Sequence, residues 1–155
     1  MSAKRLAVLS LLLWCVSVAG LAVLFVRGRT LPVAADGRTA IQLTVGERDF
    51  VLGEMRGLLA AEQGVAQALA DGDRAALIQA ARGAGMAGVG AVPAALMLKL
   101  PLDFKRAGMA MHAGFDDLAS AAATGDGWAD LRGRFAAHLG HCVACHQAWR
   151  LQATP

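Results

Sequence analysis

The residues best suited to chemistry lie near the C-terminus, in the stretch Gly-His-Cys-Val-Ala-Cys-His at 140–146. Cys142, Cys145 and His146 have C-x-x-C-H spacing. On a helix, positions i, i+3 and i+4 share a face, so two thiols and one imidazole would project to the same side. The thiols could then add to the two vinyl groups of a porphyrin while His146 binds its iron. This pattern is the attachment signature of c-type haem, and it predicts one covalently bound haem c.

Other interpretations of the same stretch remain open. A zinc site would need His141 and the three motif residues as ligands, although zinc ligands normally come from two separate segments and His141 lies off the shared face. A dithiol redox pair normally begins a helix that follows a strand, whereas this motif lies in the last helix expected. A chance occurrence, in a thiol or interaction module without haem, is the third alternative. The only other cysteine, Cys15, lies in an apolar run.

The chain around the motif is predicted to be all-α. Alanine and leucine are abundant, tyrosine is absent and aromatic residues make up 5%. Thr44 and Glu47 form a capping-box pattern that predicts a helix over 45–70, with apolar residues recurring at helical spacing. Shorter or later helices are expected at 74–83, before Leu100, at 102–123 after Pro101, and at 128–151. The simplest arrangement of residues 44–151 is an antiparallel four-helix bundle.

The N-terminus is predicted to be a membrane anchor over residues 1–29. Residues 6–26 carry no charge and would span about 31 Å as a helix, which matches the apolar thickness of a bilayer. A cleaved signal peptide is the alternative, but its apolar region is normally only about 7 to 15 residues long. Residues 30–43 contain Pro32 and show little periodicity, so they are expected to act as a tether.

The charge distribution argues against nucleic acid as a partner. Four of the 15 basic residues lie within 1–29, which has no acidic residue, so the remainder holds 11 basic and 12 acidic residues. No basic face is interleaved with aromatic residues. The glycine pattern at 83–88 matches G-x-G-x-x-G but lacks a preceding strand, so an interhelical loop is expected there.

With these features, residues 44–151 resemble the cytochrome c′ and cytochrome c-556 family of four-helix bundles. That family carries C-x-x-C-H near the end of its last helix, often followed by an aromatic residue and an arginine, here Trp149 and Arg150. Its first helix carries an arginine and, four residues later, the side chain over the open iron face. The matching positions here are Arg48 and Leu52.

The resemblance implies two functions that differ in the sixth iron ligand. In c′-type members a residue such as Leu52 leaves the iron five-coordinate and able to bind NO or CO. In c-556-type members a first-helix methionine binds the iron and the protein carries electrons. Met55 lies one turn after Leu52 on the same face, and we favour it as the ligand. Arg48 is expected beside a haem propionate, or in an ion pair with Asp49.

Together these features predict a membrane-tethered monohaem electron carrier rather than an enzyme, with iron held by His146 and Met55. Haem of this type is attached on the outer side of the bacterial cytoplasmic membrane, so the anchored domain is expected in the periplasm. If the N-terminal segment is cleaved, the domain would be soluble in the periplasm. Redox proteins and the bilayer are the expected partners. The sequence leaves open whether two copies pair through their first helices. His138 and His141 are expected at the surface.

Overall fold

The computed structural model describes residues 3–90 and 92–154 and is mostly helical. The described residues form six α-helices, one 3-10 turn and two strands. These are α1 Ala3–Arg27, β1 Thr39–Thr44, α2 Val45–Asp71, α3 Arg74–Ala84, η1 Met86–Gly88, α4 Ala94–Lys99, α5 Leu102–Thr124, α6 Trp128–Ala148 and β2 Trp149–Thr154. The strands correct the all-α expectation, while the predicted helices are present with small shifts at their ends.

Local signals in the sequence account for the helix ends. Thr44 and Glu47 form both hydrogen bonds of the capping box at the start of α2. Gly72 and Gly125 end α2 and α5 in the left-handed conformation, with φ of 68° and 93°, which glycine adopts without steric cost. Pro101 directly precedes α5, where its missing N–H leaves no helical bond unmade.

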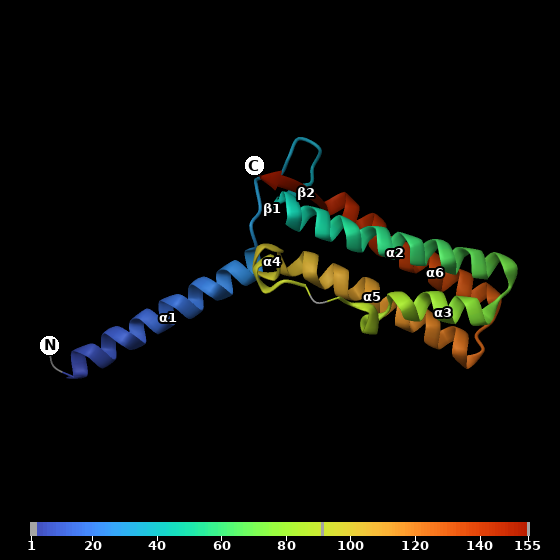
Figure 1. Ribbon diagram of the computed structural model, residues 1–155, viewed down its shortest axis with the longest axis horizontal. Helices are drawn as coiled ribbons and strands as arrows, with labels where there is room; N and C mark the ends of the chain where they lie inside the picture. The colour runs from blue at the N-terminus through green and yellow to red at the C-terminus, as the bar shows by residue number, and fades with distance from the viewer. Residues whose placement is uncertain (1–2, 91, 155) are drawn as a thin grey trace.

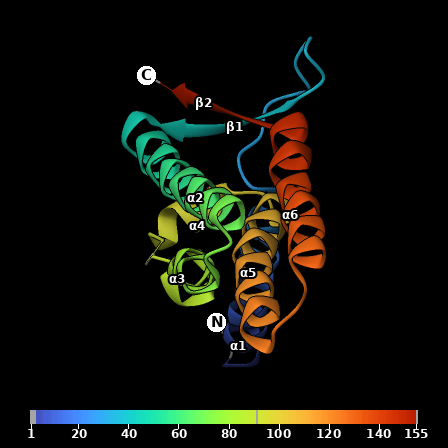
Figure 2. The ribbon, with the colours of Figure 1, turned by 90° about the vertical axis from the view of Figure 1, so that its right-hand side faces the viewer.

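Helices α2, α3, α5 and α6 lie side by side and enclose the larger core (Figures 1 and 2). Its fully buried members include Val65, Leu77, Phe115, Leu118 and Leu131. Helix α2 packs along α3, α3 along α5, and α5 along α6, whereas α2 and α6 approach each other only briefly. A cleft lined by side chains of both helices lies between α2 and α6.

One end of the cleft is bounded by the two strands. Helix α6 ends at Ala148 rather than continuing to 151, and β2 then pairs in parallel with β1. Thr39 lies opposite Trp149, and Thr44 lies opposite Thr154. A second, smaller core beneath this sheet is formed by buried Ile41, Leu43, Val51, Leu96 and Leu100.

Helix α1 extends away from the other helices (Figure 1). It has a mean hydropathy of 2.5 and is long and apolar enough to cross a membrane; a signal sequence would satisfy the same criteria. Residues 1–2, also assigned to the anchor, lie outside the described residues. None of its described residues is buried within the protein.

The segment that follows α1 differs from the tether expected over residues 30–43. Arg29 N donates to Lys99 O at 2.7 Å, and Gln42 N donates to Arg29 O at 2.8 Å. Leu31 N donates to Ala40 O at 2.9 Å, so this segment pairs with β1 on the edge opposite β2. The backbone hydrogen bonds of this segment hold it against the domain.

Lys105 and Gly28 form the junction between α1 and the domain. The Lys105 ammonium donates to Phe25 O at 2.6 Å and Met97 O at 3.2 Å, and it lies 3.4 Å from the centre of the Phe25 ring. Burial lowers the pKa of Lys105. Gly28 has φ of 64°, and a Cβ there would overlap the backbone at Lys99 and Pro101. The α1 terminus is thus closely packed against α4 and α5.

Candidate cofactor site

The C-x-x-C-H motif lies on the face of α6 that turns toward the interior. Leu131, Phe135, His138, Cys142 and Cys145 recur at steps of four and three residues along this helix. Leu131 and His138 are buried, and Phe135 and Cys142 pack against the larger core. Residues at these steps share one face of a helix, so both motif thiols point toward the cleft.

The opposite wall of the cleft belongs to α2. Val51, Met55, Leu58, Glu62 and Val65 follow the same steps of four and three residues. Two adjoining cavities, of about 370 and 380 Å³, lie between this stripe and α6. Volumes of this size are typical of small-molecule sites.

The two cavities share most of the residues singled out from the sequence. The side chains lining both are Leu52, Met55, Phe104, Cys145 and His146. Arg48 lines the first cavity and Cys142 the second. All six predicted site residues therefore surround one continuous cleft, although His146 remains exposed at its edge.

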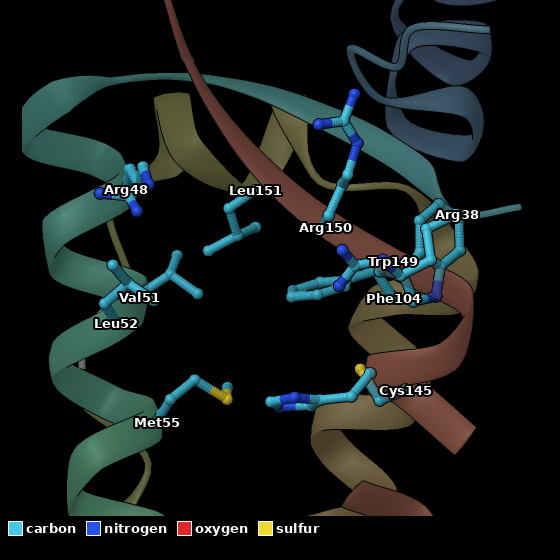
Figure 3. A pocket seen from close by; sticks show the side chains of 11 residues that line it. Arg38, Arg48, Val51, Leu52, Met55, Phe104, Cys145, Trp149, Arg150 and Leu151 are labelled. Carbon is cyan, nitrogen blue, oxygen red and sulfur yellow. The ribbon is translucent and has the colours of Figure 1, made fainter. Parts of the chain in front are cut away.

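The first cavity has an apolar end and a basic end (Figure 3). Met55 projects from α2 across the pocket from Cys145 on α6, while Arg48, Arg38 and Arg150 lie toward the sheet. Arg48 contacts Asp49 at 3.7 Å, as the sequence allowed. The guanidinium of Arg150 points away from Met55, and its Nε is buried without a hydrogen-bond partner among the described residues.

Burial raises the pKa of both motif thiols. For Cys142 the nearby Glu62 carboxylate raises the pKa further, and for Cys145 the neighbouring Cys142 does so. Reactive dithiol pairs depend on the opposite, a lowered thiol pKa that yields thiolate near neutral pH. The environment of this pair therefore gives no support to a dithiol redox site.

The zinc interpretation also lacks a suitable arrangement. Within residues 3–90 and 92–154, no group of three or more His, Cys, Asp or Glu side chains is placed to hold a metal ion. His141 lines the second cavity but stands beside His138, with ring centres 6.0 Å apart, rather than beside both thiols in a tetrahedral cluster.

Several residues of the cleft differ from or go beyond the sequence expectations. His138, expected at the surface, is only 5% exposed because α6 turns it toward Glu62 and Phe115. Arg38 reaches the cleft from the loop before β1, and no local sequence signal predicts this. Glu62 interrupts the apolar stripe of α2, which is a signal that could have identified it.

The donor set fits a covalently attached haem. Two half-buried thiols and an adjacent imidazole face a cleft whose other wall carries a thioether, Met55, and a cation, Arg48. These are the groups that would form thioethers, coordinate iron and pair with a carboxylate. Comparisons of the chain with protein-family models, with curated proteins and with solved structures give no match.

Proposed function

We propose that this protein is a membrane-tethered monohaem c-type cytochrome of the four-helix-bundle class that passes single electrons. The observation that carries the proposal is the position of C-x-x-C-H on the cleft-facing side of α6, opposite the apolar stripe of α2. The motif is uncommon in a chain with only three cysteines, and its thiols face a cavity of suitable size.

Each residue of the cleft has a defined part in this proposal. Cys142 and Cys145 would hold the porphyrin by thioether bonds, and His146 would bind the iron through its imidazole. Met55 would supply a thioether ligand to the iron from α2. Arg48 neutralises a propionate carboxylate.

The remaining walls control the environment of the site. Bound haem would supply the one-electron redox chemistry. Leu52, Phe104 and the other apolar side chains that line the first cavity would exclude water and so lower the local dielectric constant. Their contacts would also fix the orientation of the porphyrin. Electron transfer needs only the bound redox group, its ligands and a pocket that holds it, and we therefore propose a carrier rather than an enzyme.

Helix α1 sets the location that we propose. It would hold the domain at the cytoplasmic membrane, with the haem on the periplasmic side where such cofactors are attached. Cleavage of α1 as a signal sequence would instead release a soluble periplasmic carrier. The proposed partners are one-electron redox proteins at the membrane. A dimer of two copies paired through their first helices would be compatible with this role.

A five-coordinate haem that binds NO or CO is the second candidate. Leu52 favours it, because this leucine lines both cavities one turn from Met55 on the same helix. If Leu52 rather than Met55 covers the iron, the sixth position stays open to a small gas. The cavity walls would then select apolar diatomic ligands over water.

Covalent attachment is tested first. The chain, expressed in a host that matures c-type cytochromes, should show the mass of polypeptide plus one haem and a haemochrome spectrum after denaturation in pyridine. Replacing both motif cysteines by alanine should abolish this gain, whereas Cys15→Ala, which alters the third cysteine, should retain it. A bare polypeptide mass for the wild type would reject the proposal.

Met55→Ala and Leu52→Ala distinguish the two candidates. In the carrier, Met55→Ala should change a low-spin ferric spectrum to high-spin and allow CO binding after reduction, because the thioether ligand is lost. Leu52→Ala should leave the low-spin spectrum in place. A wild-type protein that is already high-spin and binds CO would favour the five-coordinate candidate.

A further inference from the structure

A buried acid–base pair connects α2 and α6 beside the candidate haem site. Nε2 of His138 lies 3.1 Å from Oε1 of Glu62, and their side chains are only 4% and 7% exposed. Neither carboxylate oxygen and neither ring nitrogen forms a well-aligned hydrogen bond within the described part of the chain. Two titratable groups are thus removed from water with only each other as partners.

The surroundings of the pair are apolar and closely packed. The ring of His138 meets Phe115 edge-on, with centres 4.4 Å apart. Gly114 also lies against this ring, where a Cβ would overlap Nδ1 of His138. The backbone of α5 therefore makes room for an imidazole at this position.

Such a pair is a poor device for stability alone. The cost of removing two charges from water often exceeds their mutual attraction, and apolar residues of similar volume are often as stable or more stable. Glu62 and His138 each occupy a position in the interior stripe of their helix, and the stripe is otherwise largely apolar. The pair is therefore better explained by a function than by its contribution to stability.

The pair lies close to the groups that would hold the cofactor. Glu62 lines the second cavity together with Cys142 and Cys145. Its charge acts on the Cys142 sulfur, where it adds to the effect of burial in raising the pKa of that thiol. A porphyrin bound through Cys142 would be within the electrostatic influence of the pair in a low-dielectric interior.

The other charged and titratable groups around the pair are few. Those lining the same cavity are Arg56 from α2 and His141, Cys142, Cys145 and His146 from α6. Helix α5 contributes only uncharged side chains to this cavity and to the His138 ring. In the haem-bound protein the two cysteines are thioethers and no longer titrate, so Glu62 and His138 are the buried proton-binding groups beside the cofactor.

Resting on the proposed function, we propose that Glu62 and His138 form a proton-binding site coupled to electron transfer by the haem. In the haem-loaded protein, reduction of the iron by a one-electron donor, which is itself oxidised, would remove one positive charge from the site, and the Glu62–His138 pair would take up as much as one proton from water. Reoxidation returns the electron to an acceptor and the proton to water. Coupling between two binding events is reciprocal, so a proton on the pair also favours the reduced iron.

The sign of the effect follows from this coupling. Because the reduced protein holds protons more tightly, raising the pH favours the oxidised protein and lowers the midpoint potential. A full proton per electron corresponds to a tenfold change in equilibrium constant per pH unit, or about 59 mV. Partial uptake gives a proportionally smaller slope.

The test is spectroelectrochemical titration of the full-length, haem-loaded protein between about pH 5 and pH 9, the range in which histidine commonly titrates. The wild-type potential should fall with pH. Glu62→Gln keeps the shape of the side chain but cannot exchange a proton, so its slope should be smaller. Glu54→Gln removes an exposed carboxylate from the same helix and should keep the wild-type slope, including any contribution from propionates.

A second measurement and a second variant complete the test. Oxidation by ferricyanide in weakly buffered solution should release protons from the wild type, and fewer from Glu62→Gln. If Glu62→Gln does not fold, the double variant Glu62→Met, His138→Leu takes its place. Equal slopes and equal proton release in the wild type and in either variant would overturn the coupling while leaving the cytochrome intact. A wild-type chain without covalent haem would overturn both proposals.

Discussion

Lys105 and the Glu62–His138 pair are both withdrawn from water, but their surroundings satisfy them very differently. The Lys105 ammonium donates to two backbone carbonyls that end helices and lies against an aromatic ring. The Glu62–His138 pair has a single contact of 3.1 Å and no aligned hydrogen bond among the described residues. An ammonium with two carbonyl acceptors and an aromatic neighbour is held firmly in place, whereas the buried polar atoms of the pair lack aligned partners, which is costly in a low-dielectric interior.

The largest expected effect comes from breaking the pair on one side. His138→Leu leaves the Glu62 carboxylate buried without a partner and should lower the free energy of unfolding by about 3–5 kcal/mol. The double variant Glu62→Met, His138→Leu removes both charges and should recover most or all of this loss. Urea unfolding of the haem-loaded proteins measures both changes.

That comparison also has a clear contrary outcome. If the double variant is as unstable as His138→Leu alone, the loss comes from packing around the ring rather than from an unpaired charge. The distinction between the pair and Lys105 would then have no electrostatic basis.

The next effect comes from Lys105→Met, which keeps the length of the side chain but removes its donor. The carbonyls of Phe25 and Met97 lose their shared donor, which should lower the free energy of unfolding by about 1–3 kcal/mol. Unfolding in urea in the presence of detergent measures this loss. Arg106→Met, at the exposed neighbouring position, is the matched control and should have little effect. If Lys105→Met and Arg106→Met have the same free energy of unfolding, Lys105 does not stabilise the junction between α1 and the domain.

The smallest effect concerns a third charged contact, between Lys99 and Glu47 at 2.6 Å. The Lys99 ammonium lowers the pKa of Glu47, with help from Thr44. The stabilisation from this carboxylate is therefore complete above its unfolded pKa, near 4.5, and is lost as the pH falls through the lower folded value.

Glu47→Gln tests this sign. Glutamine can still complete the capping box but does not titrate, so the variant should be less stable at neutral pH by about 0.5–1 kcal/mol and show a weaker loss in acid. Thermal unfolding at a series of pH values records both. A variant whose acid dependence equals that of the wild type would assign the loss to other carboxylates.

Local signals in the sequence identified the parts of the fold that depend on nearby residues. The Thr44–Glu47 capping box and Pro101 gave the starts of α2 and α5 because each acts on its own helix turn. The common face of Cys142, Cys145 and His146 also follows from helical spacing alone. These features need no knowledge of the tertiary structure.

Local sequence signals do not predict contacts between segments that are far apart in the chain. The stretch Trp-Arg-Leu-Gln-Ala-Thr at 149–154 alternates apolar and polar residues, but it is short and directly follows a helix, so its periodicity alone does not predict a strand. Its pairing with β1 joins the two ends of the domain. The contact of Glu62 with His138 depends likewise on the register between α2 and α6. The charged residue on the α2 stripe was a visible clue, but its partner was not.

The junction at Gly28 and Arg29 has a consequence for encounters at a membrane. A flexible tether would let the domain move freely above the membrane and meet electron donors in three dimensions. If α1 spans a bilayer as proposed, the backbone hydrogen bond between Arg29 and Lys99 and the packing of Gly28 on Pro101 would instead hold the domain at a fixed height above the lipid surface. For the proposed electron carrier, encounters with redox partners would then depend on lateral diffusion in the plane of the bilayer and on whether the redox centres of the partners lie at the same height.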